Sequence, residues 1–107
     1  MSIGAKNRRL RFQRATLVDD GLSRVEAWTD LFTVWGSKAD VSDAERWRAD
    51  AVGATVTSRF RVRRSRATSA VTRSDRIVCE GVVYGITGIK EIERSWDLEL
   101  TAAAEVE

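Results

Sequence analysis

Hydrophobic and polar residues alternate along much of this chain, which is the pattern of β-strands that bury one face. The alternation is clearest over Ala54–Arg63, where an apolar row that includes Phe60 and Val62 faces a row of threonines and arginines. It recurs near both ends of the chain. Over Arg8–Thr16 the alternation predicts that Leu10 and Phe12 point inside the domain and that the polar row points outside: Arg9, Arg11 and Gln13. Over Ser95–Ala102 it predicts an inside row of Trp96, Leu98, Leu100 and Ala102. The outside row of that strand is Asp97, Glu99 and Thr101.

A second kind of strand is predicted over Thr29–Lys38, ending near Gly36, where β-forming residues occupy both faces. A strand that is apolar on both faces is typical of one covered on both sides. We interpret one cover as the core of the domain and the other as a partner molecule. The preceding segment, Leu17–Ser23, contains two aspartates, a glycine and a serine, and this composition predicts a turn.

The segments Arg76–Glu80 and Val82–Ile86 are predicted to pair as a hairpin around Glu80-Gly81. Gly85 and Gly88 indicate a β-bulge in the same region. Ile89–Ile92 leads into the last strand. The small polar segment Arg64–Thr72 is interpreted as a loop.

The chain changes character after the second predicted strand. Ser42 and Glu45 are spaced as a helical capping box, so this segment is either a short surface helix closed by Gly53 or an ordered loop. Trp47 stands between two arginines and is expected to be exposed unless it packs on a neighbour. Together, the segments predict an all-β single domain over residues 1–107: a small antiparallel barrel or sandwich of about six strands.

Composition narrows the possible chemistry. The 107 residues contain no histidine, no proline and one cysteine, Cys79, which we interpret as a small buried hydrophobe. The lack of histidine removes the commonest general base and transition-metal ligand, and a single cysteine excludes an intrachain disulfide and multi-cysteine metal clusters. No phosphate-binding glycine motif is present. We therefore expect no catalytic site, no cofactor and no metal, and the apolar runs are too short to predict a membrane span.

Charge is distributed unevenly although the net charge is only +2. Basic residues gather in Lys6–Arg14 and in Arg59–Arg76, where Asp75 is the single acid, and acids dominate from Lys90 onward. Three roles remain open for the row Arg59, Arg61 and Arg63. The row is a solvated strand face, or it pairs with acids of an adjacent subunit such as Asp97 and Glu99, or it contacts a DNA backbone.

The order of these features resembles the phage head–tail joining family, the head-completion or stopper proteins of long-tailed phages. The resemblance covers nearly the whole chain and rests on spacing rather than on one motif. Its pieces are the basic opening Lys6–Phe12, the turn Asp19-Asp20-Gly21, the aromatic strand Trp28–Gly36, the segment Phe60–Arg63, the hairpin Asp75–Ile86 and the closing strand Trp96–Thr101. One departure is Gly36, where family members often carry alanine.

The resemblance implies a structural protein of the virion neck, or of the neck of a phage-like gene-transfer particle, that assembles in the host cytoplasm. It implies a ring, commonly of twelve copies, between the portal or adaptor and the tail terminator or tail tube, around the packaged double-stranded DNA. The expected subunit contacts are Arg59, Arg61, Arg63, Asp97, Glu99, Trp28, Phe32 and Trp35. The resemblance also implies a long loop or short helix inserted between the second and third long strands, over residues 37–53. The residues expected to face the DNA channel from this insertion are Asp40, Asp43, Glu45, Arg46, Trp47 and Arg48. The alternatives are a stand-alone basic barrel that binds nucleic acid and another neck subunit such as a tail terminator.

Overall fold

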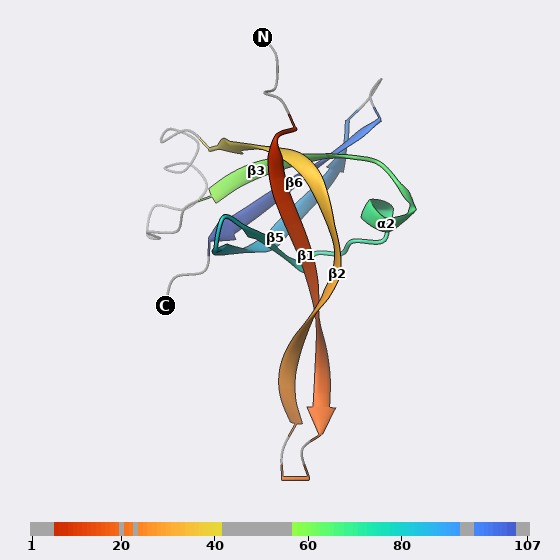
Figure 1. Cartoon of the computed structure of the whole chain (residues 1–107), viewed down its shortest axis with the longest axis vertical. Coiled ribbons are helices and arrows are strands. Elements are labelled where there is room, and N and C mark those ends of the chain that lie inside the picture. The colour runs from red at the N-terminus through yellow and green to blue at the C-terminus, as the bar shows by residue number, and fades with distance from the viewer. Residues whose placement is uncertain (1–5, 20, 23, 42–56, 93–95, 105–107) are drawn as a thin grey trace.

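Six strands form a closed antiparallel barrel in the computed structural model, which describes residues 6–19, 21–22, 24–41, 57–92 and 96–104 (Figure 1). The strand order around the barrel is β1-β2-β3-β6-β5-β4, and β4 closes the ring by pairing with β1. This arrangement confirms the predicted all-β barrel. The elements are β1 (Arg8–Asp19), β2 (Arg24–Asp40), β3 (Thr57–Arg63), α2 (Arg66–Ser69), β4 (Arg76–Cys79), β5 (Val82–Glu91) and β6 (Asp97–Ala104).

The core is filled by the inward rows that the alternation predicts. Leu10 and Phe12 of β1 are fully buried, as are Phe60 and Val62 of β3, and β6 contributes Leu98, Leu100 and Ala102. The Phe12 ring stacks on Phe32 at 4.8 Å between centroids, and Phe60 meets Tyr84 edge-on at 5.0 Å. Cys79 lies in this core with 2% of its surface exposed, as its position in the pattern indicates.

For two residues, the face predicted by the alternation differs from the face seen in the structure. Trp96 was expected inside but is 73% exposed, because β6 begins one residue later and the indole lies against the Arg64 guanidinium rather than the core. Gln13 was expected outside but is buried. Its amide is covered by the two side chains that it bonds, Arg76 and Asp30, at the point where Leu31 of β2 forms a bulge opposite β1.

The first two strands are longer than predicted, and the segment predicted as a turn shrinks accordingly. β1 continues to Asp19 and β2 begins at Arg24. The turn keeps the acid-glycine chemistry: Gly21 has φ +92° and its N–H donates to Asp19 Oδ1 at 2.9 Å. At the other end β2 continues to Asp40, so residues 37–40 belong to the strand rather than to the insertion. The predicted capping box at Ser42, Trp47 and the rest of the insertion lie outside the described residues.

The segment predicted as the loop Arg64–Thr72 contains the four-residue helix α2. Its N-cap is Ser65, whose side chain accepts from the Thr68 N–H at 3.1 Å while the Thr68 hydroxyl accepts from the Ser65 N–H at 2.8 Å. Threonine therefore takes the role that glutamate or glutamine usually has in a capping box, which is why the pattern gave no signal.

The β4–β5 hairpin confirms the predicted turn. Cys79 pairs with Val82 around Glu80 and Gly81, which have φ of 51° and 80°, as in a two-residue turn with both central residues left-handed. β5 runs on to Glu91, and its pairing with β6 shifts between Ile86 and Gly88, where the glycines indicated a bulge. Among the described residues, no helix is long and apolar enough to cross a membrane.

Candidate assembly surface

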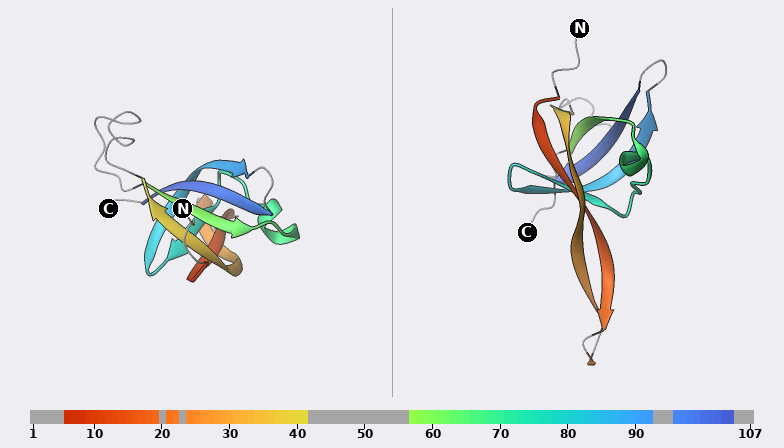
Figure 2. Two further views of the ribbon diagram at one scale, coloured as in Figure 1. Left: turned by 90° about the horizontal axis from the view of Figure 1, so that it is seen from above. Right: turned by 45° about the vertical axis from the view of Figure 1, so that its right-hand side comes forward.

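A two-stranded arm projects from the barrel. β1 pairs with β4 only as far as Gln13, and β2 pairs with β3 only from Gly36 onward. Residues 14–19, 21–22 and 24–29 therefore form a ribbon, here called the arm, that leaves the barrel as a twisted hairpin (Figures 1 and 2). Within the described part of the chain, both outer edges of the arm lack a strand partner, and such edges are sites for contact with another chain.

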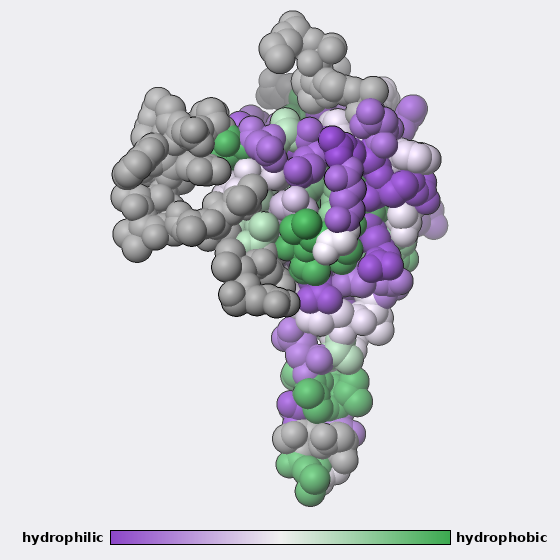
Figure 3. All heavy atoms as spheres, turned by 60° about the vertical axis from the view of Figure 1, so that its left-hand side comes forward, coloured by the Kyte–Doolittle hydropathy of each residue, from purple (hydrophilic) through white to green (hydrophobic). Residues whose placement is uncertain are grey.

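The arm carries apolar side chains on its surface. Leu22 at the turn is 96% exposed, Leu17 is 67% exposed, and Val18 and Val25 are each 48% exposed. Val18 and Val25 pair directly across the ribbon and share one face. Figure 3 shows hydrophobic side chains grouped on the arm; on the barrel above it, this side carries many hydrophilic residues around a hydrophobic patch. Exposed apolar groups concentrated on one projecting element mark an interaction site.

The base of the arm is tied to the barrel by Arg14. Its guanidinium donates to both carboxylate oxygens of Asp75, at 2.9 and 3.0 Å, and to the Ala70 carbonyl at 3.0 Å. The Asp75 side chain is fully buried and also accepts from the Thr72 N–H at 2.9 Å. Burial opposes ionisation of Asp75, but the bonds from Arg14 and Thr72 outweigh it and hold the pKa of Asp75 below its ordinary value of 3.8.

A second tie at the base runs through Arg76. Its guanidinium lies 4.0 Å from the centroid of the Trp28 ring, and its Nε donates to Gln13 Oε1 at 2.8 Å. Gln13 in turn donates to Asp30 Oδ1 at 2.7 Å. These contacts join β4 to both strands of the arm and set its direction. The alternation of hydrophobic and polar residues predicts neither tie. The sequence signal for the first tie is Asp75, the single acid in an arginine-rich segment.

The three aromatic residues predicted for a subunit contact point in different directions. Phe32 packs against the core and Trp28 lies half-buried at the base of the arm. Trp35 is 55% exposed, and the Arg9 guanidinium lies 4.6 Å from its ring centroid. Beside them is an open groove of about 320 Å³ lined by Arg9, Arg11, Thr33, Val78, Glu80 and Gly81. Of the three, Trp35 is the residue most available to a neighbouring molecule.

The arginine row of β3 lies beside the acids of β6 in the same chain. Arg61 Nε is 2.9 Å from Asp97 Oδ2, and Arg59 Nε is 3.9 Å from Glu99 Oε1. Lys6 also reaches Asp97, at 3.1 Å. Arg59 and Arg61 thus each have an acidic partner within the same subunit. The contact of these four residues with a neighbouring subunit stays a prediction.

Of the residues predicted to face a DNA channel, Asp40 is the one the structure describes. It lies at the end of β2, accepts from the Ser58 hydroxyl at 2.9 Å and is 3.4 Å from Lys38 Nζ. The remaining five lie outside the described residues: Asp43, Glu45, Arg46, Trp47 and Arg48.

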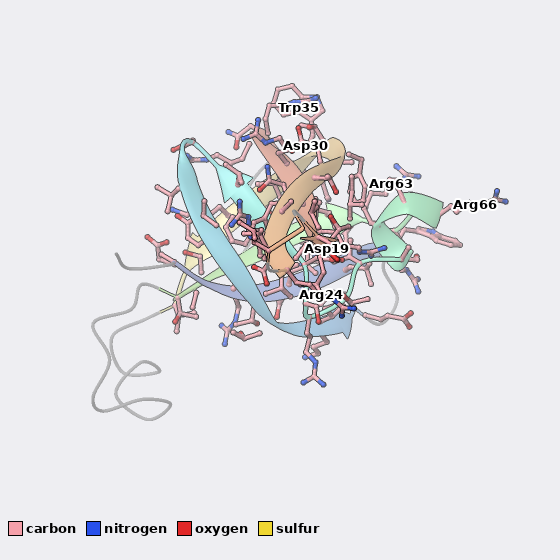
Figure 4. All side chains as sticks on the ribbon, turned by 90° about the horizontal axis from the view of Figure 1, so that it is seen from below. Asp19, Arg24, Asp30, Trp35, Arg63 and Arg66 are labelled. Atoms are coloured by element: carbon pink, nitrogen blue, oxygen red, sulfur yellow. The ribbon has the colours of Figure 1, made fainter. Side chains whose placement is uncertain are left out.

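A separate basic and aromatic surface surrounds the start of α2. Arg63 and Arg66 are exposed (Figure 4), and no carboxylate of the described residues forms an ion pair with either. Trp96 lies beside this segment of the chain: its carbonyl accepts from the Arg64 N–H at 2.5 Å, and the Arg64 guanidinium lies 5.4 Å from its ring centroid. We call Arg63, Arg66 and Trp96 the α2 corner. Arginine and tryptophan are the residue types most enriched at the centres of protein interfaces.

The described residues offer little for catalysis. Burial, helped by the neighbouring Glu80 charge, raises the pKa of the Cys79 thiol, which makes it a poor nucleophile. Among the described residues, no three potential metal ligands converge.

Comparison with known proteins identifies a family and similar solved structures. The family model described as phage head completion protein matches residues 1–105. The solution structure of protein SF1141 from Shigella flexneri 2a is 25% identical, covers 100% of this chain and 99% of that one, and has a TM-score of 0.78. A chain of the virion of a native gene transfer agent particle is 24% identical, covers 94% of both chains and has a TM-score of 0.69, a likeness of fold. No curated protein matches.

Proposed function

Since the chain belongs to the phage head completion protein family, we propose that it is a structural subunit of the virion neck, built into the junction between the filled head and the tail. The observation that carries this proposal is the family match over residues 1–105 of a 107-residue chain. The geometry supports it. A rigid closed barrel carries an unpartnered arm at one end and exposed arginine and aromatic side chains elsewhere, as expected of a subunit completed by its neighbours.

In finer detail, we propose that copies of the chain form a ring between the portal or adaptor and the tail terminator or tail tube, with packaged DNA passing through or held behind it. The work of such a ring is geometric, because repeated head-to-tail contacts close on themselves and make many small interfaces act together. No covalent step is assigned to the subunit.

The test is deletion of the coding sequence from the phage or phage-like particle that carries it. Cells should then accumulate DNA-containing heads and separate tails, and negative-stain microscopy should show few joined particles. Expression of the intact chain from a plasmid should restore tailed particles, and mass spectrometry should find it in them. Normal tailed particles without the protein would overturn the proposal.

Retention of DNA is measured in the same strains. If the ring also closes the channel, heads made without the chain should lose their DNA to added nuclease, while heads made with it stay protected. If heads made without the chain were as well protected from nuclease as heads made with it, the role of the chain would be limited to tail attachment.

A further inference from the structure

We propose that the arm of one subunit docks on the α2 corner of the next copy in the ring, so that a single head-to-tail contact links neighbours. The inference rests on the proposed neck function and adds to it which surfaces meet. The two surfaces lie on different parts of the same chain: Figure 4 looks along the arm, with Asp19 and Arg24 on it, while Arg63 and Arg66 lie to one side at α2. Different surfaces meeting in this way give a heterologous contact, which can close into a ring.

The arm needs a partner because it is a two-stranded ribbon without a core of its own. Isolated two-stranded hairpins are marginally stable in water. Leu17, Leu22 and the Val18–Val25 pair leave apolar surface in solvent, which costs free energy that burial against a neighbour recovers. The ties at Arg14 and Arg76 hold the base of the arm in one direction, so docking costs little conformational entropy.

The α2 corner complements one charged group of the arm, Glu26, and offers an apolar surface to the leucines of the arm. Glu26 on the arm is exposed, and no basic group of the described residues forms an ion pair with it. Arg63 and Arg66 are the matching cations, and Trp96, 73% exposed, offers a large flat apolar surface to the leucines. An arm that met a second arm would instead make a two-fold contact, which closes at two subunits and does not continue around a ring.

Cysteine cross-linking in assembled particles tests the contact. The variant carries Leu22→Cys and Trp96→Cys, both at strongly exposed positions, and keeps the buried Cys79. A short flexible bis-maleimide should join neighbouring subunits into a ladder of multimers on a reducing gel. The matched control carries Leu22→Cys and Thr87→Cys, with the second thiol at an exposed position on β5, and should give no ladder.

Particles that contain two single-cysteine chains sharpen the result. A mixture of Leu22→Cys subunits and Trp96→Cys subunits should give dimers and nothing larger, whereas each chain alone should give no cross-link. Dimers from Leu22→Cys alone would show that arms meet arms and would overturn the inference. Incorporated chains that never cross-link would also overturn it, while leaving the neck function intact. Failure of the chain to enter particles would instead count against the neck function itself.

A charge exchange gives an independent readout. Glu26→Arg should reduce the yield of tailed particles about tenfold, because it places a cation against Arg63 and Arg66. Combining it with Arg63→Glu and Arg66→Glu should restore most of that yield. Loss without recovery in the triple variant would contradict the pairing, since all three positions are exposed and tolerate charge in the folded barrel.

Discussion

Asp75 is the residue on which the position of the arm most depends. Its carboxylate is fully buried, yet it is ionised because Arg14 and the Thr72 N–H satisfy its oxygens. A buried carboxylate of this kind stabilises the fold only while it remains charged and paired. The residue therefore links the geometry of the arm to pH.

Replacement of Asp75 by asparagine should make stability less dependent on pH. Because the folded-state pKa is lowered, the contribution of ionised Asp75 is full above its ordinary pKa of 3.8 and is lost as the pH falls through the lower folded value. Asp75→Asn should cost about 2 kcal/mol of unfolding free energy at pH 7. Urea unfolding at several pH values should show this difference shrinking in acid. Glu26→Gln, at an exposed site, is the control, and a difference that stays constant down to pH 2 would contradict the assignment.

Gly36 is required by packing rather than by backbone conformation. A Cβ built there would lie 2.5 Å from Leu10 Cδ1 and 2.9 Å from the Arg61 carbonyl oxygen. The carbonyl belongs to the paired strand β3 and cannot move alone, so Gly36→Ala should destabilise the barrel by about 1–3 kcal/mol. Gly85→Ala is the matched control, because nothing lies within 4 Å of its Cβ position. Equal thermal midpoints for the two variants would refute this account.

At the scale of elements, the barrel strands were predictable because each has one buried face. Leu98, Leu100 and Ala102 alternate with polar residues, and the turn at Glu80-Gly81 separates two such runs. The arm was not predictable in the same way. Leu17, Val18 and Val25 face solvent in the subunit, so no buried face imposes a period of two on them. Asp75 stands out in the sequence as the single acid of an arginine-rich segment, but its partner does not, because Arg14 meets Asp75 across 61 positions of sequence.

The stacking of Arg76 on Trp28 should determine how rigid the arm is. Trp28→Ala removes the ring and should raise amide hydrogen exchange in residues 15–18 and 25–27 about fivefold, because a cation–π contact contributes about 1 kcal/mol. Exchange in β3 and β6 should change little. Leu22→Ala at the tip should leave arm exchange as it is in the parent. A uniform rise across all strands would mean that Trp28 supports the barrel instead.

At the scale of the whole molecule, the buried core and the exposed apolar residues of the arm lie in different parts of the chain. Among the described residues, the core draws on the barrel and on none of the arm beyond Gln13. The exposed apolar residues Leu17, Val18, Leu22 and Val25 lie on the arm. A subunit built this way can fold before it meets its neighbours, and the proposed docking would give its arm a partner during assembly.

Removing the outer arm should therefore separate the two roles. Thr16 pairs with Ala27, so replacing residues 17–26 by Asn-Gly keeps the register and supplies a two-residue turn that suits a hairpin. The shortened chain should unfold in one cooperative transition with a midpoint close to that of the parent, because the core and both ties at the base are retained. In the deletion strain it should fail to restore tailed particles, although it is made in normal amounts. If the shortened chain restored tailed particles fully, the barrel alone would be sufficient for joining head and tail. Assembly contacts would then be expected on barrel surfaces such as Trp35 and Arg9.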